Sequence, residues 1–354
     1  MKKIRVMVID DSAFSRRTIT KMLENLSVIE VIGYAINGEE GIQKITALKP
    51  DLITLDLEMP KMDGFTLLRI ITARFSIPVI VISALSGADK VFKALELGAL
   101  DFIAKPSCGA SPDLVTIQGD LHRKILQVIN LKPRLRGYSS KPLHSTSLAN
   151  GHMKPVHTED KNLPVEIVAI GASTGGPPAL QNIFSSFEHP YPLAIVVSQH
   201  MPVGFTQAFA ERLDRSSVFS IKEAENGDPV LPGHILIAPG GKNLTFKSRG
   251  GMVTACVKPP STTDRYIPCV DSMFESCASI YRNRMIAVIL TGMGNDGTRG
   301  ITAVKENGGF IISESEETAV VYGMPREAAA TGLVDKIVPL PQIAQEILVK
   351  SALV

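Results

Sequence analysis

The chain has 354 residues, of which 45% are hydrophobic and 20% charged, and its formal net charge is +2. A chain of this length rarely forms a single hydrophobic core, so we expect two domains of an ordinary globular composition. The near-neutral charge gives no reason to expect a nucleic-acid or membrane-surface partner.

The first apolar run, Ile4–Ile9, is cut by Asp10 and Asp11 and is too short for a signal peptide. No run reaches the roughly 18 apolar residues of a membrane span. The cysteines show no Cys-x-x-Cys pairing, which argues against a zinc site or a disulfide framework. We therefore expect a cytoplasmic protein with no membrane segment.

The first third of the chain alternates short apolar runs with segments of helical periodicity. The expected strands are Ile4–Ile9, Val28–Ala35, Leu52–Leu55, Pro78–Ile82 and Leu100–Ala104. The expected helices are residues 14–26, Gly38–Leu48, Phe65–Arg74, Asp89–Leu97 and 114–128. Repeated alternation of strand and helix predicts a doubly wound α/β domain with a five-stranded parallel sheet.

Acidic residues follow two of these strands directly. Asp10 and Asp11 follow the first strand and Asp56 follows the third, so a parallel sheet gathers all three at one edge. Carboxylates that crowd together repel one another unless a hard cation such as Mg²⁺ lies among them. Lys105 and Ser83 end two other strands at the same edge and could bind a phosphoryl oxygen. The alternative is a set of loop acids and a lysine with its charge in solvent, but the gathering of these strand ends at one edge argues against it.

The helical and strand patterns disappear between Lys132 and Pro164, where polar residues, proline and glycine predict a linker. Its basic residues are scattered and aromatic residues are nearly absent. A solvated tether therefore explains this segment better than a nucleic-acid-binding arm.

Strands and helices alternate again after the linker. The expected strands are 167–170, Leu193–Ser198, His234–Ala238, Leu244–Phe246, Met252–Val257, Met285–Leu290 and Phe310–Ser313. The expected helices are Ala179–Phe187, Phe205–Leu213, Val270–Tyr281, Gly300–Glu306, a short stretch from Gly323, and Leu340–Lys350. This pattern predicts a second α/β domain with a mostly parallel sheet and antiparallel additions.

Three polar residues follow strands of this second domain. Ser173 lies in Gly171-Ala-Ser-Thr-Gly175 after the first strand, His200 follows the second, and Asp296 follows 285–290. A serine needs a base to become a nucleophile, and the base needs a group that orients it. Each residue alone has a simpler explanation: tight packing for the Gly-x-Ser-x-Gly turn, a structural histidine, or a turn-forming Asn-Asp-Gly. Their common place at one sheet edge favours a catalytic triad.

Two common enzyme folds fit this set poorly. A dinucleotide-binding domain requires Gly-x-Gly-x-x-Gly, which Gly171–Gly176 does not match. The α/β-hydrolases follow the order serine, acid, histidine, whereas this chain has serine, histidine, acid. The triad geometry also arises on unrelated folds, so the order excludes a family and not the chemistry.

The first domain resembles the response-regulator receiver. The resemblance is carried by Asp10-Asp11, Leu-Asp56-Leu-Glu-Met-Pro60, Ser83-Ala84 and Phe102-Ile-Ala-Lys105-Pro106. It implies that Asp56 accepts a phosphoryl group from a chemotaxis histidine kinase, with Mg²⁺ held by Asp10, Asp11 and Asp56. It also implies that Ser83, Phe102 and Lys105 form the switch that responds, although a phenylalanine cannot donate a hydrogen bond.

The second domain is similar to the catalytic domain of the chemotaxis protein-glutamate methylesterase and glutamine deamidase (CheB) family. The matching motifs are 170–176, Gln199-His200-Met-Pro202, Ala238-Pro-Gly240, 290–297 and Gly323-Met-Pro-Arg-Glu-Ala328. Two places depart from the family pattern. Asn243 stands where the family often has a histidine, and Tyr266-Ile-Pro-Cys-Val270 differs from the usual sequence of that segment.

The resemblance implies demethylation of glutamate methyl esters, and deamidation of glutamines, on methyl-accepting chemotaxis receptors. Ser173, His200 and Asp296 would form the triad, supported at the oxyanion by Thr174, Met293 and Gly294, and this step needs no cofactor. The implied domains are 1–130 (receiver), 131–162 (flexible linker) and 163–354 (methylesterase), in a monomer. The alternative is a response regulator whose second domain only binds a partner.

Overall fold

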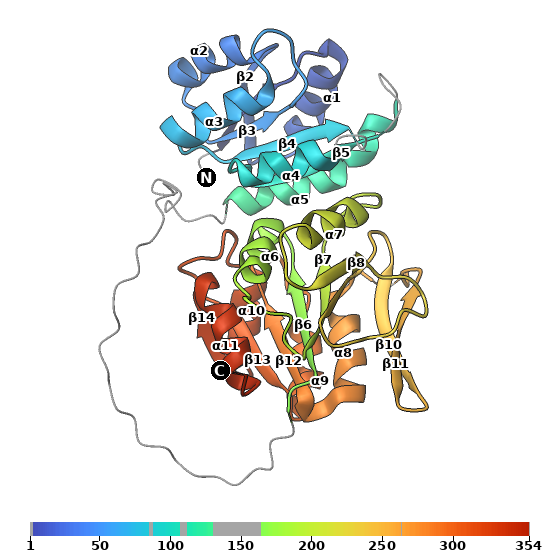
Figure 1. Cartoon of the computed structure of the whole chain (residues 1–354). Coiled ribbons are helices and arrows are strands. Elements are labelled where there is room, and N and C mark those ends of the chain that lie inside the picture. The colour runs from blue at the N-terminus through green and yellow to red at the C-terminus, as the bar shows by residue number, and fades with distance from the viewer. Residues whose placement is uncertain (1–2, 85–87, 107–111, 130–163, 263, 354) are drawn as a thin grey trace, which may run out of the picture.

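Two parallel β-sheets, each covered by helices on both faces, organise the chain (Figure 1). The computed structural model describes residues 3–84, 88–106, 112–129, 164–262 and 264–353. The predicted linker, 131–162, lies outside the described residues. Within the described part of the chain, no helix is both long and apolar enough to cross a membrane.

The first sheet is five-stranded, in the order β2-β1-β3-β4-β5, and all its pairs are parallel. The strands are β1 (Ile4–Ile9), β2 (Ile29–Ala35), β3 (Leu52–Leu55), β4 (Val79–Ala84) and β5 (Asp101–Lys105). The helices are α1 (Ala13–Glu24), α2 (Gly38–Leu48), α3 (Gly64–Arg74), α4 (Ala88–Glu96), the 3₁₀ turn η2 (Pro112–Ile117) and α5 (Gln118–Ile129). The predicted five-stranded parallel domain is confirmed.

Alternation along β1, an interior strand, explains why helices cover both faces of this sheet. Val6 and Val8 pack in the apolar cluster beneath α1 and α5, whereas Met7 and Ile9 pack in the cluster beneath α2, α3 and α4. Successive side chains of a strand point to opposite faces, so a strand that is apolar throughout must be covered on both.

The second sheet has seven strands in the order β14-β13-β12-β6-β7-β9-β8, all parallel. The strands are β6 (Ile167–Ala172), β7 (Ala194–Gln199), β8 (Ser220–Glu223), β9 (His234–Ile237), β12 (Met285–Ile289), β13 (Phe310–Glu314) and β14 (Lys336–Val338). β10 (Asn243–Arg249) and β11 (Met252–Lys258) form a separate antiparallel hairpin, as predicted. The short strands β8 and β14 were not predicted.

Helices cover this sheet on both faces. They are α6 (Gly176–Ser185), α7 (Thr206–Asp214), α8 (Val270–Tyr281), α9 (Thr298–Glu306), α10 (Met324–Ala330) and α11 (Ile343–Lys350), with 3₁₀ turns η4 (Arg282–Arg284) and η5 (Leu340–Gln342). From β6 the chain crosses to β7 on one side, and from β12 it crosses to β13 on the other. The carboxyl ends of β6 and β12 therefore flank a topological switch point, where open α/β sheets place their binding crevices.

The two domains are in contact. α4 of the first domain packs against α6 and α7 of the second (Figure 1). A single apolar cluster runs through this contact, and it includes Phe92 and Phe102 from one domain and Phe205 and Phe209 from the other.

Candidate functional site

Ser173 lies in a tight turn between β6 and α6. Its backbone N–H donates to the Thr291 carbonyl at 3.0 Å, and its own carbonyl accepts from Gly176 N–H at 2.8 Å. Gly175 adopts a φ of 80°, and a Cβ atom there would lie 2.7 Å from Cβ of Val320. Only glycine fits this left-handed, crowded position. The turn thus fixes Ser173, which is half-buried, at the start of a helix.

His200 leaves the neighbouring strand beside Ser173. Ala172 and Gln199 are partners in the β6–β7 register, and His200 N–H donates to the Ala172 carbonyl at 3.0 Å. The side chain of Gln199 is only 2% exposed, and its Nε2 donates to the carbonyls of Ser173 at 2.9 Å and of His200 at 3.1 Å. One buried amide therefore joins the backbones of the two residues.

Asp296 is brought to His200 by the loop after β12. Oδ2 of Asp296 lies 2.7 Å from Nε2 of His200. The same carboxylate accepts from the backbone N–H groups of Val270 at 2.8 Å and Asp271 at 3.0 Å, at the start of α8. Burial disfavours the charged carboxylate, but the hydrogen bonds from His200 and from these N–H groups hold the pKa of Asp296 below its usual value. Asp296 is therefore ionised when it contacts the imidazole.

The arrangement leaves one imidazole nitrogen available. With Nε2–H donated to Asp296, Nδ1 carries the lone pair that could accept a proton from the Ser173 hydroxyl. No hydrogen bond joins that hydroxyl to the imidazole among the residues that the structure describes. Such bonds are often long in a free enzyme and shorten when substrate binds.

The loop 291–297 closes the other side of Ser173. A Cβ atom on Gly292 would lie 2.6 Å from Cβ of Ser173, so the two segments are in close contact. The next residues of this loop are Met293 and Gly294, and Gly294 has a φ of 93°. The structure therefore places two of the three predicted oxyanion-supporting residues in the loop against the serine.

The third, Thr174, contacts the first domain instead. Its hydroxyl donates to the carboxylate of Asp101 in β5, and Nζ of Lys124 lies 2.6 Å from the same carboxylate. The carbonyl of Thr174 accepts from the Thr291 hydroxyl at 2.9 Å. The residue next to Ser173 is thus held by both domains, which the sequence did not predict.

Glu314 is a buried carboxyl behind the site that the sequence analysis missed. It is 0% exposed and accepts from the backbone N–H of Thr291 at 2.8 Å and from the Thr318 hydroxyl at 3.0 Å. Burial raises the pKa of Glu314 to about 7. An acidic residue directly after the expected strand Phe310–Ser313 was the only signal in the sequence.

The acidic residues of the first domain also meet. One carboxylate oxygen from each of Asp10, Asp11 and Asp56 lies within 4.8 Å of the others. Nζ of Lys105 lies 2.9 Å from Asp10 and also bonds Asp56. Burial, together with the charge of Asp56, raises the pKa of Asp10 despite the opposing charge of Lys105. Crowded oxygen ligands whose charge Lys105 compensates only in part fit a divalent cation such as Mg²⁺.

The predicted switch residues differ in their surroundings. Ser83 is buried at the end of β4, one strand from Asp56. Phe102 is 2% exposed and its ring packs on Phe205 of the second domain, with centroids 4.7 Å apart. The residue predicted as the aromatic switch therefore lies in the contact between the domains.

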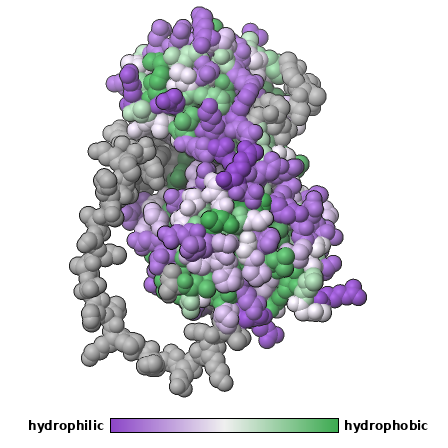
Figure 2. Space-filling view, viewed as in Figure 1, coloured by the Kyte–Doolittle hydropathy of each residue, from purple (hydrophilic) through white to green (hydrophobic). Residues whose placement is uncertain are grey.

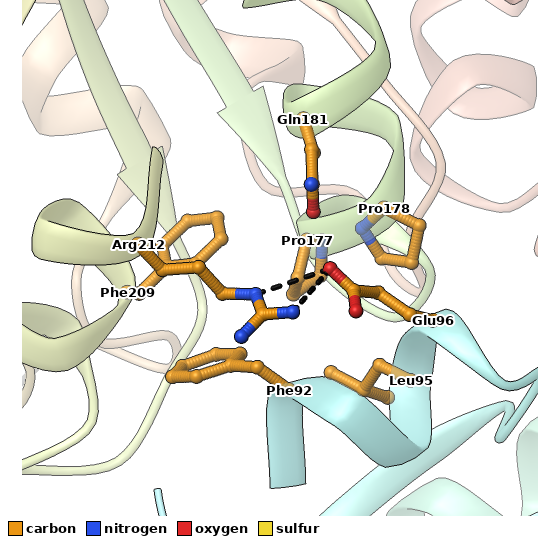
Figure 3. A pocket seen from close by; sticks show the side chains of 8 residues that line it. All are labelled: Phe92, Leu95, Glu96, Pro177, Pro178, Gln181, Phe209 and Arg212. Carbon is orange, nitrogen blue, oxygen red and sulfur yellow. Dashed lines mark hydrogen bonds and ion pairs between the residues drawn. The ribbon is translucent and has the colours of Figure 1, made fainter. Parts of the chain in front are cut away.

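Polar and charged groups surround this apolar contact. Glu96 at the end of α4 forms an ion pair with Arg212 of α7, beside the stacked rings of Phe92 and Phe209 (Figure 3). Hydrophilic side chains gather around the junction on the face shown in Figure 2. An apolar centre with a polar rim is typical of interfaces that can separate.

The folds and these two sites define a response regulator that joins a receiver to an α/β domain with a serine, a histidine and an aspartate at one sheet edge. Family models agree: residues 6–116 match the response regulator receiver domain, and 168–347 match the CheB methylesterase. The chain belongs to the CheB methylesterase family.

Relatives match along nearly the whole chain. A protein named protein-glutamate methylesterase/protein-glutamine glutaminase 3 from Geobacter sulfurreducens is 53% identical, over 100% of this chain and 99% of its own. A similarly named protein from Myxococcus xanthus is 44% identical over 96% and 95%. The crystal structure of the Thermotoga maritima CheB methylesterase catalytic domain has 42% identity and a TM-score of 0.51, covering 54% of this chain and all of that one.

Proposed function

We propose that the protein hydrolyses glutamate methyl esters, and glutamine amides, on chemoreceptors in the cytoplasm. The single observation that carries this proposal is the contact of His200 with ionised Asp296 beside the Ser173 turn, in a chain of this family. The names of the relatives supply the substrate class. Residues 163–354 would form the catalytic domain and 1–130 the receiver, in a monomer.

In the proposed reaction, Ser173 Oγ attacks the side-chain carbonyl carbon while Nδ1 of His200 takes the hydroxyl proton. Asp296 stabilises the imidazolium that results. The backbone around Thr174, Met293 and Gly294 would hold the oxyanion, a contribution of roughly 10²–10³ in rate. His200 then returns the proton to the leaving oxygen, and methanol departs. Water activated by His200 releases the acyl group as glutamate, and an amide substrate releases ammonia by the same steps.

The receiver would regulate this reaction. Asp56 would accept a phosphoryl group from the chemotaxis histidine kinase, with Asp10, Asp11 and Asp56 holding Mg²⁺, whose charge would neutralise phosphoryl oxygens. Asp101 and Phe102 both contact the catalytic domain, and Asp101 bonds Thr174, the neighbour of the nucleophile. A change at Asp56 that displaces β5 would therefore free the catalytic edge.

Methanol release from methylated receptor membranes tests the activity. The full chain should release methanol and Ser173→Ala should not, whereas Ser216→Ala, at an exposed serine that follows α7, should match the unmodified chain. Methanol release by Ser173→Ala at the normal rate would remove the nucleophile assignment. Absence of release by the unmodified and phosphorylated chain would favour an output domain that only binds.

Regulation is tested by comparing the full chain with a fragment that starts near residue 163. The match to the structure of a catalytic domain on its own supports such a fragment. The fragment should be more active than the unphosphorylated full chain. Equal rates would exclude inhibition by the receiver.

A further inference from the structure

Tyr266 lies flat against the imidazole of His200. The two ring centroids are 5.1 Å apart and the ring planes differ by 2°. Tyr266 belongs to the segment that precedes α8 and is half-buried. The hydrogen bond to Asp296 holds one nitrogen of the imidazole, and Tyr266 covers the face of the same ring.

The hydroxyl end of Tyr266 reaches the loop beside the serine. A Cβ atom on Gly294 would lie 2.2 Å from the Tyr266 hydroxyl oxygen and 2.8 Å from Cζ. Gly294 belongs to the loop that contacts Ser173 through Gly292. One side chain therefore touches both the candidate base and the candidate oxyanion loop.

A stacked ring restricts the orientation of the imidazole plane, which a single hydrogen bond does not. A hydrogen bond at Nε2 permits the imidazole plane to rotate about that contact, and such a rotation changes the direction in which Nδ1 points. A flat neighbour blocks the rotation because the ring would collide with it. The negative face of an aromatic ring also favours the cationic imidazolium formed during the reaction.

We propose that Tyr266 is a positioning residue, which aims Nδ1 of His200 at the Ser173 hydroxyl and stabilises the imidazolium. This inference rests on the proposed role of His200 as the base. A small misplacement of a reacting group can lower a rate by about 10²-fold, so loss of the ring should act on kcat. It should leave KM nearly unchanged, since the observed contacts of the ring are with His200 and with the loop at Gly294.

Arg265 offers a competing explanation. Its guanidinium lies over the Tyr266 ring, 5.5 Å from the centroid, and Arg265 is exposed. If Tyr266 only supports Arg265 as a cation for an acidic substrate, then loss of the arginine alone would reproduce the loss of the tyrosine, and KM would rise.

The test uses the phosphorylated full chain and measures kcat and KM for methanol release from methylated receptor membranes. Tyr266→Ala should lower kcat by about 10- to 100-fold and change KM by less than about twofold. Tyr266→Phe keeps the ring and should restore kcat to within about threefold. Tyr191→Ala is the matched control, because Tyr191 is also half-buried in this domain and lies next to a histidine, His189, away from the site.

Several results would overturn the proposal. These are an unchanged kcat in Tyr266→Ala, a Phe variant as slow as the Ala variant, or an Arg265→Gln variant that equals Tyr266→Ala. Thermal melts check folding, and Tyr266→Leu replaces the Ala variant if that protein unfolds. His200→Ala separates the two proposals. Full activity of this variant would refute the catalytic triad. An inactive His200→Ala variant together with an unaffected Tyr266→Ala variant would refute only the role of Tyr266.

Discussion

Replacing Asp101 by alanine should activate the unphosphorylated protein. Asp101 lies at the start of β5, is buried, and accepts the hydrogen bond from the Thr174 hydroxyl across the domain contact. A hydrogen bond to a charged partner contributes about 1.5–3 kcal/mol. At about 1.4 kcal/mol for each tenfold change, its loss should raise the ratio of open to closed molecules roughly 10- to 150-fold.

The other partner of Asp101 does not alter this expectation. Lys124 loses its ion pair when Asp101 is replaced, but it still donates to the Phe102 carbonyl at 2.5 Å within the receiver. That loss affects the receiver whether the domains are closed or open, so it cancels in the ratio. Asp101→Asn keeps an acceptor without the charge and should give an intermediate activation.

The assay is the initial rate of methanol release by the unphosphorylated full chain, with the fragment from residue 163 as the ceiling. Asp120→Ala is the matched control, because Asp120 pairs with Arg123 within α5 of the same receiver. If the fragment exceeds the full chain but Asp101→Ala does not, the Thr174 contact contributes nothing to closure and the reasoning is refuted.

Three further predictions concern single carboxylates. Asp296→Asn should lower kcat by about 10⁴-fold, because the charge that stabilises the imidazolium is lost. Initial rates of methanol release, measured beside those of Ser173→Ala, check this prediction. A loss of less than tenfold would contradict it. Burial raises the pKa of Glu314 to about 7, so the native state favours the protonated carboxyl. The contribution of Glu314 to the free energy of unfolding should therefore fall as the pH rises from about 4.3, the ordinary pKa of a glutamate, to 7. Urea unfolding at pH 5 and pH 8 should show a smaller decline for Glu314→Gln, and equal declines would mean that Glu314 does not titrate as its burial implies. Asp56→Asn should abolish Mg²⁺-dependent labelling by a small phosphodonor, whereas Asp51→Asn should leave it intact; labelling of the Asp56 variant would assign another acceptor.

Most of the fold follows from the sequence because strands buried on both faces are continuous apolar runs. Strands such as Ile4–Ile9 and helices such as Gly38–Leu48 and Val270–Tyr281 have the bounds that the pattern predicts. β8 and β14 were not predicted because each contains a single buried residue, whereas all four residues of the equally short β3 are buried and apolar or β-branched. Each lies at an edge of the sheet and pairs with one neighbouring strand, β9 or β13.

The candidate site could likewise be predicted only in part. Ser173, His200 and Asp296 could be proposed because each ends a strand, and parallel strands end at one edge. The stack of Tyr266 on His200, the Gln199 bridge and the bond from Thr174 to Asp101 depend on side-chain directions and on the domain contact. No spacing in the sequence encodes those, so they were not predicted.

The order of the strands also matters while the protein is being made. β12, which carries the loop of Asp296, enters the middle of the second sheet although it is translated long after β6. By the time β12 is synthesised, the entire receiver has emerged from the ribosome. Domains generally fold as units during synthesis, the N-terminal one first. We therefore expect the receiver to be folded before the catalytic domain acquires Asp296, its last catalytic group.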